Sequence, residues 1–351
     1  MHNKNIEKMT GVIKNFGLPR IIILCFLLLL NILMAIKDIP VGLTISQCLV
    51  RIGINLILSL AMMPGIMAGT GMNFALPIGI ECGLLAGMIS LQYNIVGFSG
   101  LFFAIICSIP MSIIAGYCYS LLLNRVRGNE MMVSTYTGFS IVALMCLVWL
   151  VLPFDNPGIV WPMGKGIRTT ITLDAWYDRI LNNLWSFSIF GIEIPTGLLL
   201  FAAFFCVLMW VFKKSRLGLM MIGAGSNPKY AIANGVDVNR MRTLSVILST
   251  VLGGIGIIIY AQGFSFYQLY NAPLMMAFPA VAAVLIGGAT TNKISIFNVV
   301  LGTIMFQSLL AIAVPVANSL IPEGNISEVV RTIVSNGIIL YALSQMKNKD
   351  R

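Results

Sequence analysis

The stretch 242–262 reads RTLSVILSTVLGGIGIIIYAQ and carries a charge only at its first residue, Arg242. A helix rises about 1.5 Å per residue, so about 20 mainly apolar residues are needed to cross the hydrocarbon core of a bilayer, which is roughly 30 Å thick. The stretch has this length and this composition. It is therefore predicted to form a transmembrane helix.

Stretches of the same kind fill the chain. Of the 351 residues, 58% are hydrophobic and only 10% are charged, whereas a soluble domain carries roughly 25% charged residues. Such a chain cannot cover a water-exposed surface, so its solvent must be largely lipid. Ten helices are predicted, at roughly 20–36, 50–68, 72–90, 98–122, 132–153, 195–212, 242–262, 275–289, 294–318 and 327–346. The sequence therefore predicts an all-α, polytopic transmembrane helical bundle that forms one domain over residues 1–351.

The lysines and arginines indicate the orientation, because cytoplasmic loops carry an excess of both. With the N-terminus in the cytoplasm, six of the 22 fall on the outer side and the other 16 on the inner side. The outer six are Lys37, Arg51, Lys165, Arg168, Arg179 and Arg331. We therefore expect residues 1–19, 213–241 and 347–351 in the cytoplasm, both termini included, and the loop 154–194 outside.

The positions of the prolines and the order of the predicted spans suggest a transporter architecture. The first and eighth helices are short, and prolines interrupt several spans, as in the broken helices of transporters. Spans 2–5 start outside and spans 7–10 start inside, which is the arrangement that an inverted repeat requires. An inverted repeat is therefore expected from topology.

Composition also excludes several function classes. The net charge of +10 could suggest nucleic acid, but the charges sit in short loops with no basic stripe interleaved with aromatics. The seven cysteines fall in or beside apolar runs without C-x-x-C spacing, and the single histidine is His2. We expect no nucleic-acid partner, no metal site and no His-based catalysis.

One intramembrane acid stands out in the segment 71–90, GMNFALPIGIECGLLAGMIS. Gly79, Gly83 and Gly87 recur every four residues, and such a stripe lets another helix approach closely. Glu81 lies about 160° from the centre of this stripe at 100° per residue, so it cannot share the packing face. A bare carboxylate costs several kcal/mol in lipid, roughly 2.5 or more on insertion scales. Glu81 is expected either in a structural hydrogen bond to a neighbouring helix or in the solute path.

The segment 213–242 contains a short capped helix on the predicted inner side. Asn227 and Pro228 have the types of an N-cap and a first helical residue, and Gly235 suits a left-handed C-cap. The residues between the caps are Lys229, Tyr230, Ala231, Ile232, Ala233 and Asn234. A helix this short is not stable alone, so it either rests on its own bundle or docks into a partner.

Polar residues elsewhere in the predicted spans are further candidates for a solute path. They include Asn55, Asn73, Gln262, Asn298 and Gln307. Hydrogen bonds between helices account for many such residues without any transport role, so both interpretations are open for each.

Three segments resemble one family. GAGSNPKYAIANGVDVNR (223–240), AVLIGGAT (283–290) and NFALPIGIECGLLAG (73–87) are similar to motifs of the permeases of ATP-binding-cassette (ABC) importers for simple sugars, nucleosides and branched-chain amino acids. Glu81 matches the acid of the nucleoside and sugar motif, while Cys82 and the run Ala75-Leu76-Pro77 depart from it.

The resemblance implies a permease in the cell membrane that does no bond chemistry. Two ATPase subunits, which hold ATP and Mg²⁺, would dock on the helix 227–234, and a second permease and an extracytoplasmic solute-binding protein would complete the machine. No Walker loop occurs in this chain. A simple sugar or a nucleoside is the favoured solute, and the second permease is either identical or a sister chain.

Two other functions are weighed against this one. An ion-coupled secondary transporter would use Glu81 as its intramembrane acid. A membrane-embedded enzyme would need clusters of His, Asp or Glu, which the sequence lacks.

Overall fold

The computed structural model describes residues 18–37, 39–164, 166–189, 191–290 and 294–320, and five isolated positions beyond them (329, 332, 333, 336 and 337). Six described helices are long and apolar enough to span a membrane, and three shorter apolar helices accompany them. The predicted polytopic helical bundle is thus confirmed, and nine of the ten predicted helices have counterparts. The tenth, 327–346, and the terminal segments 1–17 and 347–351 lie outside the described residues, apart from those isolated positions.

The elements run in this order along the chain. They are α2 (Leu18–Ile36), α3 (Val41–Leu60), α4 (Met63–Met67), α5 (Leu76–Gln92), α6 (Gly97–Arg125), α7 (Glu130–Val151), β1 (Thr170–Thr172), α8 (Ile180–Asn183), β2 (Phe187–Ile189), β3 (Ile192–Ile194), α9 (Thr196–Lys214), α10 (Arg216–Ser226), α11 (Pro228–Ala233), α12 (Val238–Phe264), β4 (Phe266–Gln268), α13 (Ala272–Met275), α14 (Ala277–Ile286) and α15 (Ile296–Leu320). The expected eighth span is indeed short and broken, into α13 and α14.

The second predicted helix begins much earlier than expected. The sequence predicts a start at residue 50, with Arg51 on the outer side, but α3 begins at Val41 and holds Arg51 in its middle. The guanidinium of Arg51 lies 5.8 Å from the centre of the Phe264 ring. A long side chain can keep its charge on an aromatic face while its stem packs in the bundle, so an arginine does not mark a helix end here.

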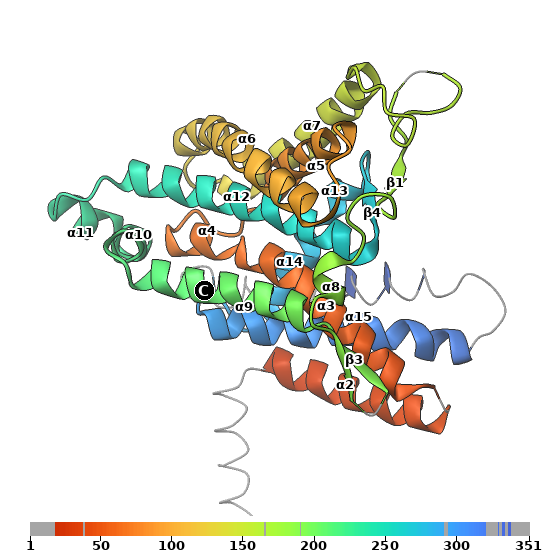
Figure 1. The fold of residues 1–351 in the computed structure, drawn as a ribbon. Helices are drawn as coiled ribbons and strands as arrows, with labels where there is room; N and C mark the ends of the chain where they lie inside the picture. Colours follow the sequence, from red (N-terminus) through yellow and green to blue (C-terminus); the bar gives the residue numbers. More distant parts are fainter. Residues whose placement is uncertain are drawn as a thin grey trace, which may run out of the picture.

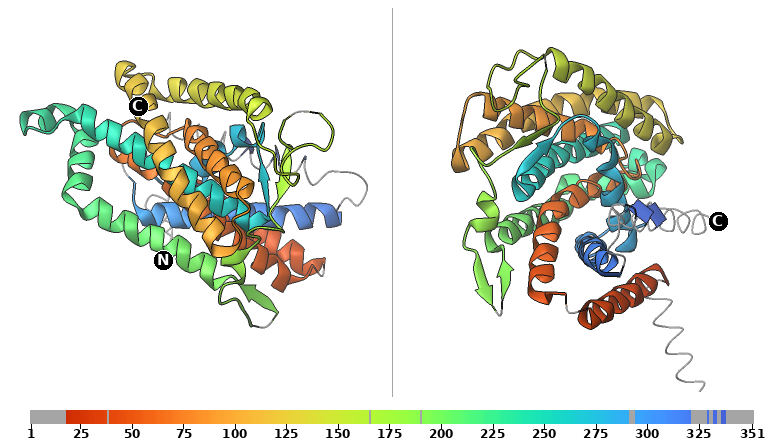
Figure 2. Two further views of the ribbon diagram at one scale, coloured as in Figure 1. Left: turned by 45° about the horizontal axis from the view of Figure 1, so that its top comes forward. Right: turned by 90° about the vertical axis from the view of Figure 1, so that its right-hand side faces the viewer.

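Helix α12 forms the middle of the bundle and packs against α3, α5 and α6 (Figure 1). Helices α2 and α15 build a smaller apolar cluster at one side. Most residues of α7 and α9 are not buried, and both helices lie on the outside of the bundle (Figure 2). The best-protected part of the molecule is therefore the contact of α12 with its neighbours.

The glycine stripe of α5 makes this contact close. A Cβ atom added to Gly79 would lie 2.2 Å from the carbonyl oxygen of Thr250, and one on Gly83 would lie 2.3 Å from that of Gly254. Both oxygens belong to α12. The expected role of the stripe, close approach of another helix, is confirmed.

The bundle has two distinct ends. At one, which we call the hairpin end, α10 and α11 connect α9 to α12 (left in Figure 1). At the other, the loop end, strand β1 from the loop 154–194 pairs antiparallel with β4, which directly follows α12. The amide of Arg179 also donates to the carbonyl of Gln262 at 3.0 Å. This loop is thus bonded to the end of α12 rather than lying free.

A buried tyrosine pair seals the loop end. The hydroxyl oxygens of Tyr177 and Tyr267 lie 3.1 Å apart, and both residues are fully buried. Burial raises the pKa of the Tyr177 phenol above its ordinary value, so the pair is a neutral hydrogen bond.

Replacing Tyr267 by phenylalanine is expected to lower the free energy of unfolding by about 1–3 kcal/mol, because it leaves the Tyr177 hydroxyl buried without its partner. The double replacement Tyr177→Phe with Tyr267→Phe should recover most of this loss, because both polar groups are then gone. Thermal unfolding in detergent measures the effect. A double variant less stable than the single one would contradict the prediction.

Candidate functional site

Side-chain caps define the hairpin end. Ser215 Oγ accepts from the amide of Gly218 and starts α10. Asn227 Oδ1 accepts from the amide of Tyr230 at 3.1 Å and starts α11, with Pro228 as its first residue. Gly235 follows with φ of +77°, a conformation that a side chain would disfavour. The predicted short helix and both of its caps are confirmed.

Helix α10 was not predicted, because its sequence RLGLMMIGAGS holds three glycines, which weaken a helix. Packing offsets this weakness. Gly218, Met221 and Ala224 are buried. A Cβ added to Gly225 would lie 2.3 Å from the carbonyl oxygen of Met67, so the backbones of α10 and of the chain after α4 touch.

The two faces of α11 differ. Ala231 is only 4% exposed and faces its own bundle, whereas Tyr230 is 68% and Ile232 61% exposed. Lys229 and Asn234 are exposed as well. A rigid, capped helix that presents an aromatic and a branched aliphatic side chain to its surroundings suits a docking surface, in which such residues act as anchors.

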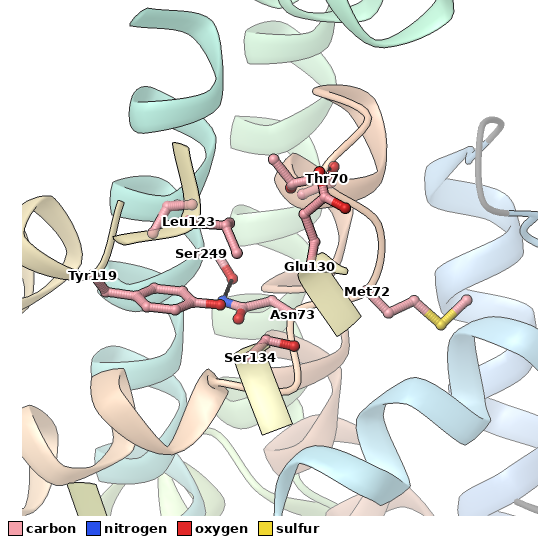
Figure 3. A pocket seen from close by; sticks show the side chains of 10 residues that line it. Thr70, Met72, Asn73, Tyr119, Leu123, Glu130, Ser134 and Ser249 are labelled. Atoms are coloured by element: carbon pink, nitrogen blue, oxygen red, sulfur yellow. Dashed lines mark hydrogen bonds between the residues drawn. The ribbon is translucent and has the colours of Figure 1, made fainter. Parts of the chain in front are cut away.

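A small polar cavity lies close to the hairpin end (Figure 3). Asn73 donates from Nδ2 to Ser249 Oγ at 2.8 Å, and its Oδ1 accepts from the amide of Ala75 at 3.0 Å. The cavity is lined by Gly65, Thr70, Met72, Asn73, Tyr119, Leu123, Glu130, Ser134, Val246 and Ser249. Its volume of about 10 Å³ is near the minimum that holds one water molecule. A sugar or nucleoside does not fit into the cavity in this conformation.

An ion pair closes one side of this cavity. Arg242 Nη2, in the first turns of α12, donates to Glu130 Oε1 at 2.9 Å, and Glu130 is the first residue of α7. Arg242 Nε also donates to Asn124 Oδ1 at 3.2 Å, at the end of α6. The Arg242–Glu130 pair, mostly shielded from solvent, thus ties three helices together.

Glu81 is buried in α5 and lies one turn after Pro77. A Cβ added to Gly138 of α7 would lie 3.6 Å from Pro77 Cδ, so this side of α5 faces α7. Neither carboxylate oxygen has a hydrogen-bond partner among the described residues. The expected structural hydrogen bond is therefore not made within this part of the chain, and a role of Glu81 in the solute path stays a prediction.

Replacing Glu81 by glutamine should leave stability unchanged or raise it by about 1 kcal/mol, because a neutral amide costs less to bury than an unpaired carboxyl group. The matched change Glu130→Gln removes one partner of the Arg242 ion pair and should cost about 3–5 kcal/mol. Thermal unfolding of both variants in detergent measures this contrast. A Glu81→Gln loss as large as that of Glu130→Gln would show that Glu81 has a partner.

The other predicted path residues are not gathered at one place. Gln262 Oε1 accepts from the amide of Leu181, and its Nε2 donates to Asn182, so it holds the loop end. Asn73 contacts Ser249, 13 residues earlier on α12, which is roughly 20 Å away along the helix.

The remaining three lie on other faces. Asn55 Nδ2 donates to the carbonyl of Arg51, one turn earlier in α3. Asn298 lies in the first turn of α15, and Gln307 is buried in the middle of that helix. Of the candidates, only Asn73 lines the polar cavity, and roles for the others in a solute path stay predictions.

The cavity contains residues that the sequence did not single out. Tyr119, Glu130 and Ser249 come from α6, α7 and α12. A charged pair flanking two predicted spans, Glu130 and Arg242, is the one signal that could have indicated their proximity, because buried charges need partners.

Residues 44–343 match the family described as "Branched-chain amino acid transport system / permease component". The chain belongs to this family. The match covers both the glycine stripe of α5 and the hairpin α10–α11, so the family assignment rests on most of the bundle.

The curated relatives are named as permeases for a sugar or for nucleosides. The galactofuranose transporter permease protein YtfT of Escherichia coli (strain K12) is 24% identical over 56% of this chain and 57% of its own length. Two relatives come from Lactococcus lactis subsp. cremoris (strain MG1363). The nucleoside ABC transporter permease protein NupC is 38% identical over 23% of this chain. The nucleoside ABC transporter permease protein NupB is 22% identical over 76% of this chain. The alignments cover 26% of NupC and 71% of NupB. The chain thus spans little more than half of the first of these relatives.

Among solved structures, an inward-facing metal-chelate-type ABC transporter is 15% identical and aligns over 91% of this chain and 99% of its own, with a TM-score of 0.45.

Proposed function

We propose that this chain is the permease subunit of an ATP-driven importer for a small polar solute. Family membership and the multi-pass bundle support a permease. The observation that carries the coupling to ATP is α11, a capped helix held by buried Ala231 and presenting Tyr230 and Ile232 outward. Partner ATPase subunits bind this helix, and the closure of the two ATPase subunits on ATP moves it.

The complete machine contains further parts. Two ATPase subunits bind ATP and Mg²⁺, a second permease copy or sister chain completes the path, and an extracytoplasmic protein delivers the solute. The hairpin end and both termini lie in the cytoplasm, and the loop 154–194 lies outside the cell membrane. The excess of basic residues on the hairpin side supports this orientation.

A nucleoside or a simple sugar is the proposed solute. The names of the relatives, galactofuranose and nucleoside transporter permeases, support these two classes. In the proposed cycle the permeases rock between outward and inward states, and binding energy from ATP at the partners drives the change.

The alternative, an ion-coupled transporter that uses Glu81, is not favoured, because the relatives are ABC transporter permeases. Within the described residues, the Glu81 carboxyl group also lacks the hydrogen-bond partner that a proton relay would use.

The test is uptake into proteoliposomes that contain this chain together with the ATPase subunits and the solute-binding protein identified by copurification with it from its native membrane. Tritiated uridine and radiolabelled galactofuranose serve as probes. Uptake of one probe should require ATP inside and persist after ion gradients are collapsed. Uptake that survives without ATP and stops with the gradients would overturn the proposal.

A further inference from the structure

The hairpin α10–α11 reaches the polar cavity by two separate routes. The first route runs through close backbone contacts, and the second follows the chain after α11 to the Arg242–Glu130 ion pair. A movement of the hairpin therefore has a direct physical connection to the cavity walls.

The first route starts at Gly225, in the last turn of α10. A Cβ added to Gly69 would lie 2.9 Å from Gly225 Cα, and Gly69 itself has φ of +71°. The next residue, Thr70, lines the cavity and donates from Oγ1 to the carbonyl of Gly65. Three residues further on, Asn73 forms the hydrogen bond to Ser249 across it.

The second route leaves the other end of the hairpin. After α11 the chain turns at Gly235, and Asp237 caps α12 by accepting from the amide of Arg240. One turn later Arg242 holds Glu130, so α7 is bonded to the first turns of α12. Displacing α11 therefore pulls on the residue that retains α7.

Helix α7 has few other buried side chains. Most of its residues are at least partly exposed, and its buried residues are few: Ser134, Gly138, Val142 and Trp149. Gly138 lets it rest on the backbone before α5, where an added Cβ would lie 2.9 Å from the carbonyl oxygen of Phe74. Its first turns, with Glu130 and Ser134, cover the cavity.

The cavity itself is equipped for a polar neutral ligand. The Tyr119 hydroxyl is buried, with the residue 4% exposed, and forms no hydrogen bond of good geometry among the described residues, although Ser134 lies beside it. Figure 3 shows it directed toward Asn73, with Ser134 and Ser249 nearby. These hydroxyl and amide groups can hydrogen-bond to the hydroxyls of a sugar or nucleoside. The carboxylate in the lining, Glu130, is paired with Arg242.

We propose that this cavity is the cytoplasmic gate of the solute path, that Tyr119 and Ser249 contact the solute as it leaves, and that the Arg242–Glu130 pair is the latch released by α11. The inference rests on the proposed function. In the structure the gate is shut, because the cavity has room for about one water molecule.

Charge reversal tests the latch in the proteoliposomes described above. Glu130→Arg or Arg242→Glu alone should lower uptake roughly tenfold or more while ATP hydrolysis continues, because each places two like charges at the pair. The exchanged variant, Glu130→Arg with Arg242→Glu, should recover uptake to within about threefold of the unchanged chain. Arg125→Glu is the matched control, since Arg125 is exposed at the end of α6, and should transport normally.

Two variants test the proposed contact between Tyr119 and the solute. Tyr119→Phe removes only the buried hydroxyl and should lower the maximal uptake rate about tenfold, the effect of one lost hydrogen bond. Tyr136→Phe, on the exposed face of α7, should leave uptake unchanged. Copurification of the ATPase subunits should be equal in all variants, since none alters α11.

The outcomes separate the two proposals. If the unchanged chain shows no ATP-dependent uptake of either probe, the proposed function fails. If the unchanged chain transports and both single reversals transport as well as it does, the latch is refuted. The latch is also refuted if the exchanged variant recovers no uptake while Arg242→Lys retains it. Normal uptake by Tyr119→Phe would refute the solute contact. Where a reversal prevents assembly, Glu130→Gln replaces it and the same uptake-to-hydrolysis ratio decides.

Discussion

Replacing Gly79 by alanine is expected to destabilise the contact between α5 and α12. The added Cβ would lie 2.2 Å from the carbonyl oxygen of Thr250 and 2.9 Å from its Cα and carbonyl carbon. All three atoms belong to the backbone of α12, so no side chain can move aside and the helices must separate. Overpacking of this kind costs about 1–3 kcal/mol or more.

The matched control is Gly223→Ala. Gly223 lies in helix α10 and has open space where its Cβ would stand. Alanine there should stabilise the helix by up to about 1 kcal/mol. Size-exclusion profiles and thermal unfolding in detergent compare the two variants, and equal stabilities would show that α5 and α12 are not in close contact.

Aspartate at both Tyr230 and Ile232 is expected to abolish copurification of the ATPase subunits. These two side chains supply the exposed apolar surface of α11, and loss of two anchors with added charge costs about 4 kcal/mol or more, roughly a thousandfold in affinity. The fold should survive, because neither side chain is buried. Affinity purification from membranes, followed by quantification of the bound ATPase, measures the effect.

Tyr93→Asp provides the matched control for this experiment. Tyr93 is 71% exposed but follows α5 at the loop end, away from the hairpin. ATPase binding should be normal in this variant. Ala231→Arg is not diagnostic, because Ala231 is buried against the bundle and its replacement would disturb the hairpin itself. Normal ATPase binding by the double aspartate variant would place the docking surface elsewhere.

The sequence predicted well whatever depends on local chemistry. The apolar runs gave the helical bundle, and Asn227, Pro228 and Gly235 gave the short helix, because a cap is formed by residues adjacent in the chain. The glycine stripe of α5 also predicted a close helix contact, since a repeat of four places small residues on one face.

Features that depend on distant residues were missed. Nothing local indicates that Arg51 lies over the Phe264 ring, so the start of α3 predicted from the sequence, residue 50, is nine residues later than the observed start at Val41. Helix α10 forms despite its three glycines because two of them, Gly218 and Gly225, allow close contact with neighbouring backbone. The pairing of Glu130 with Arg242 joins residues 112 positions apart, and only the fold brings them together.

The two ends of α12 are held very differently. At the loop end, α12 is followed by β4, which pairs with β1 and holds one residue of the buried tyrosine pair. At the hairpin end, α12 begins shortly after the left-handed turn at Gly235. With 27 residues the helix is about 40 Å long. If α12 pivots at the loop end, a tilt of only ~5° moves its hairpin end by ~3.5 Å over that length. A displacement of α11 would then carry the near end of α12 and the adjoining cavity wall with it, while the loop end stays in place.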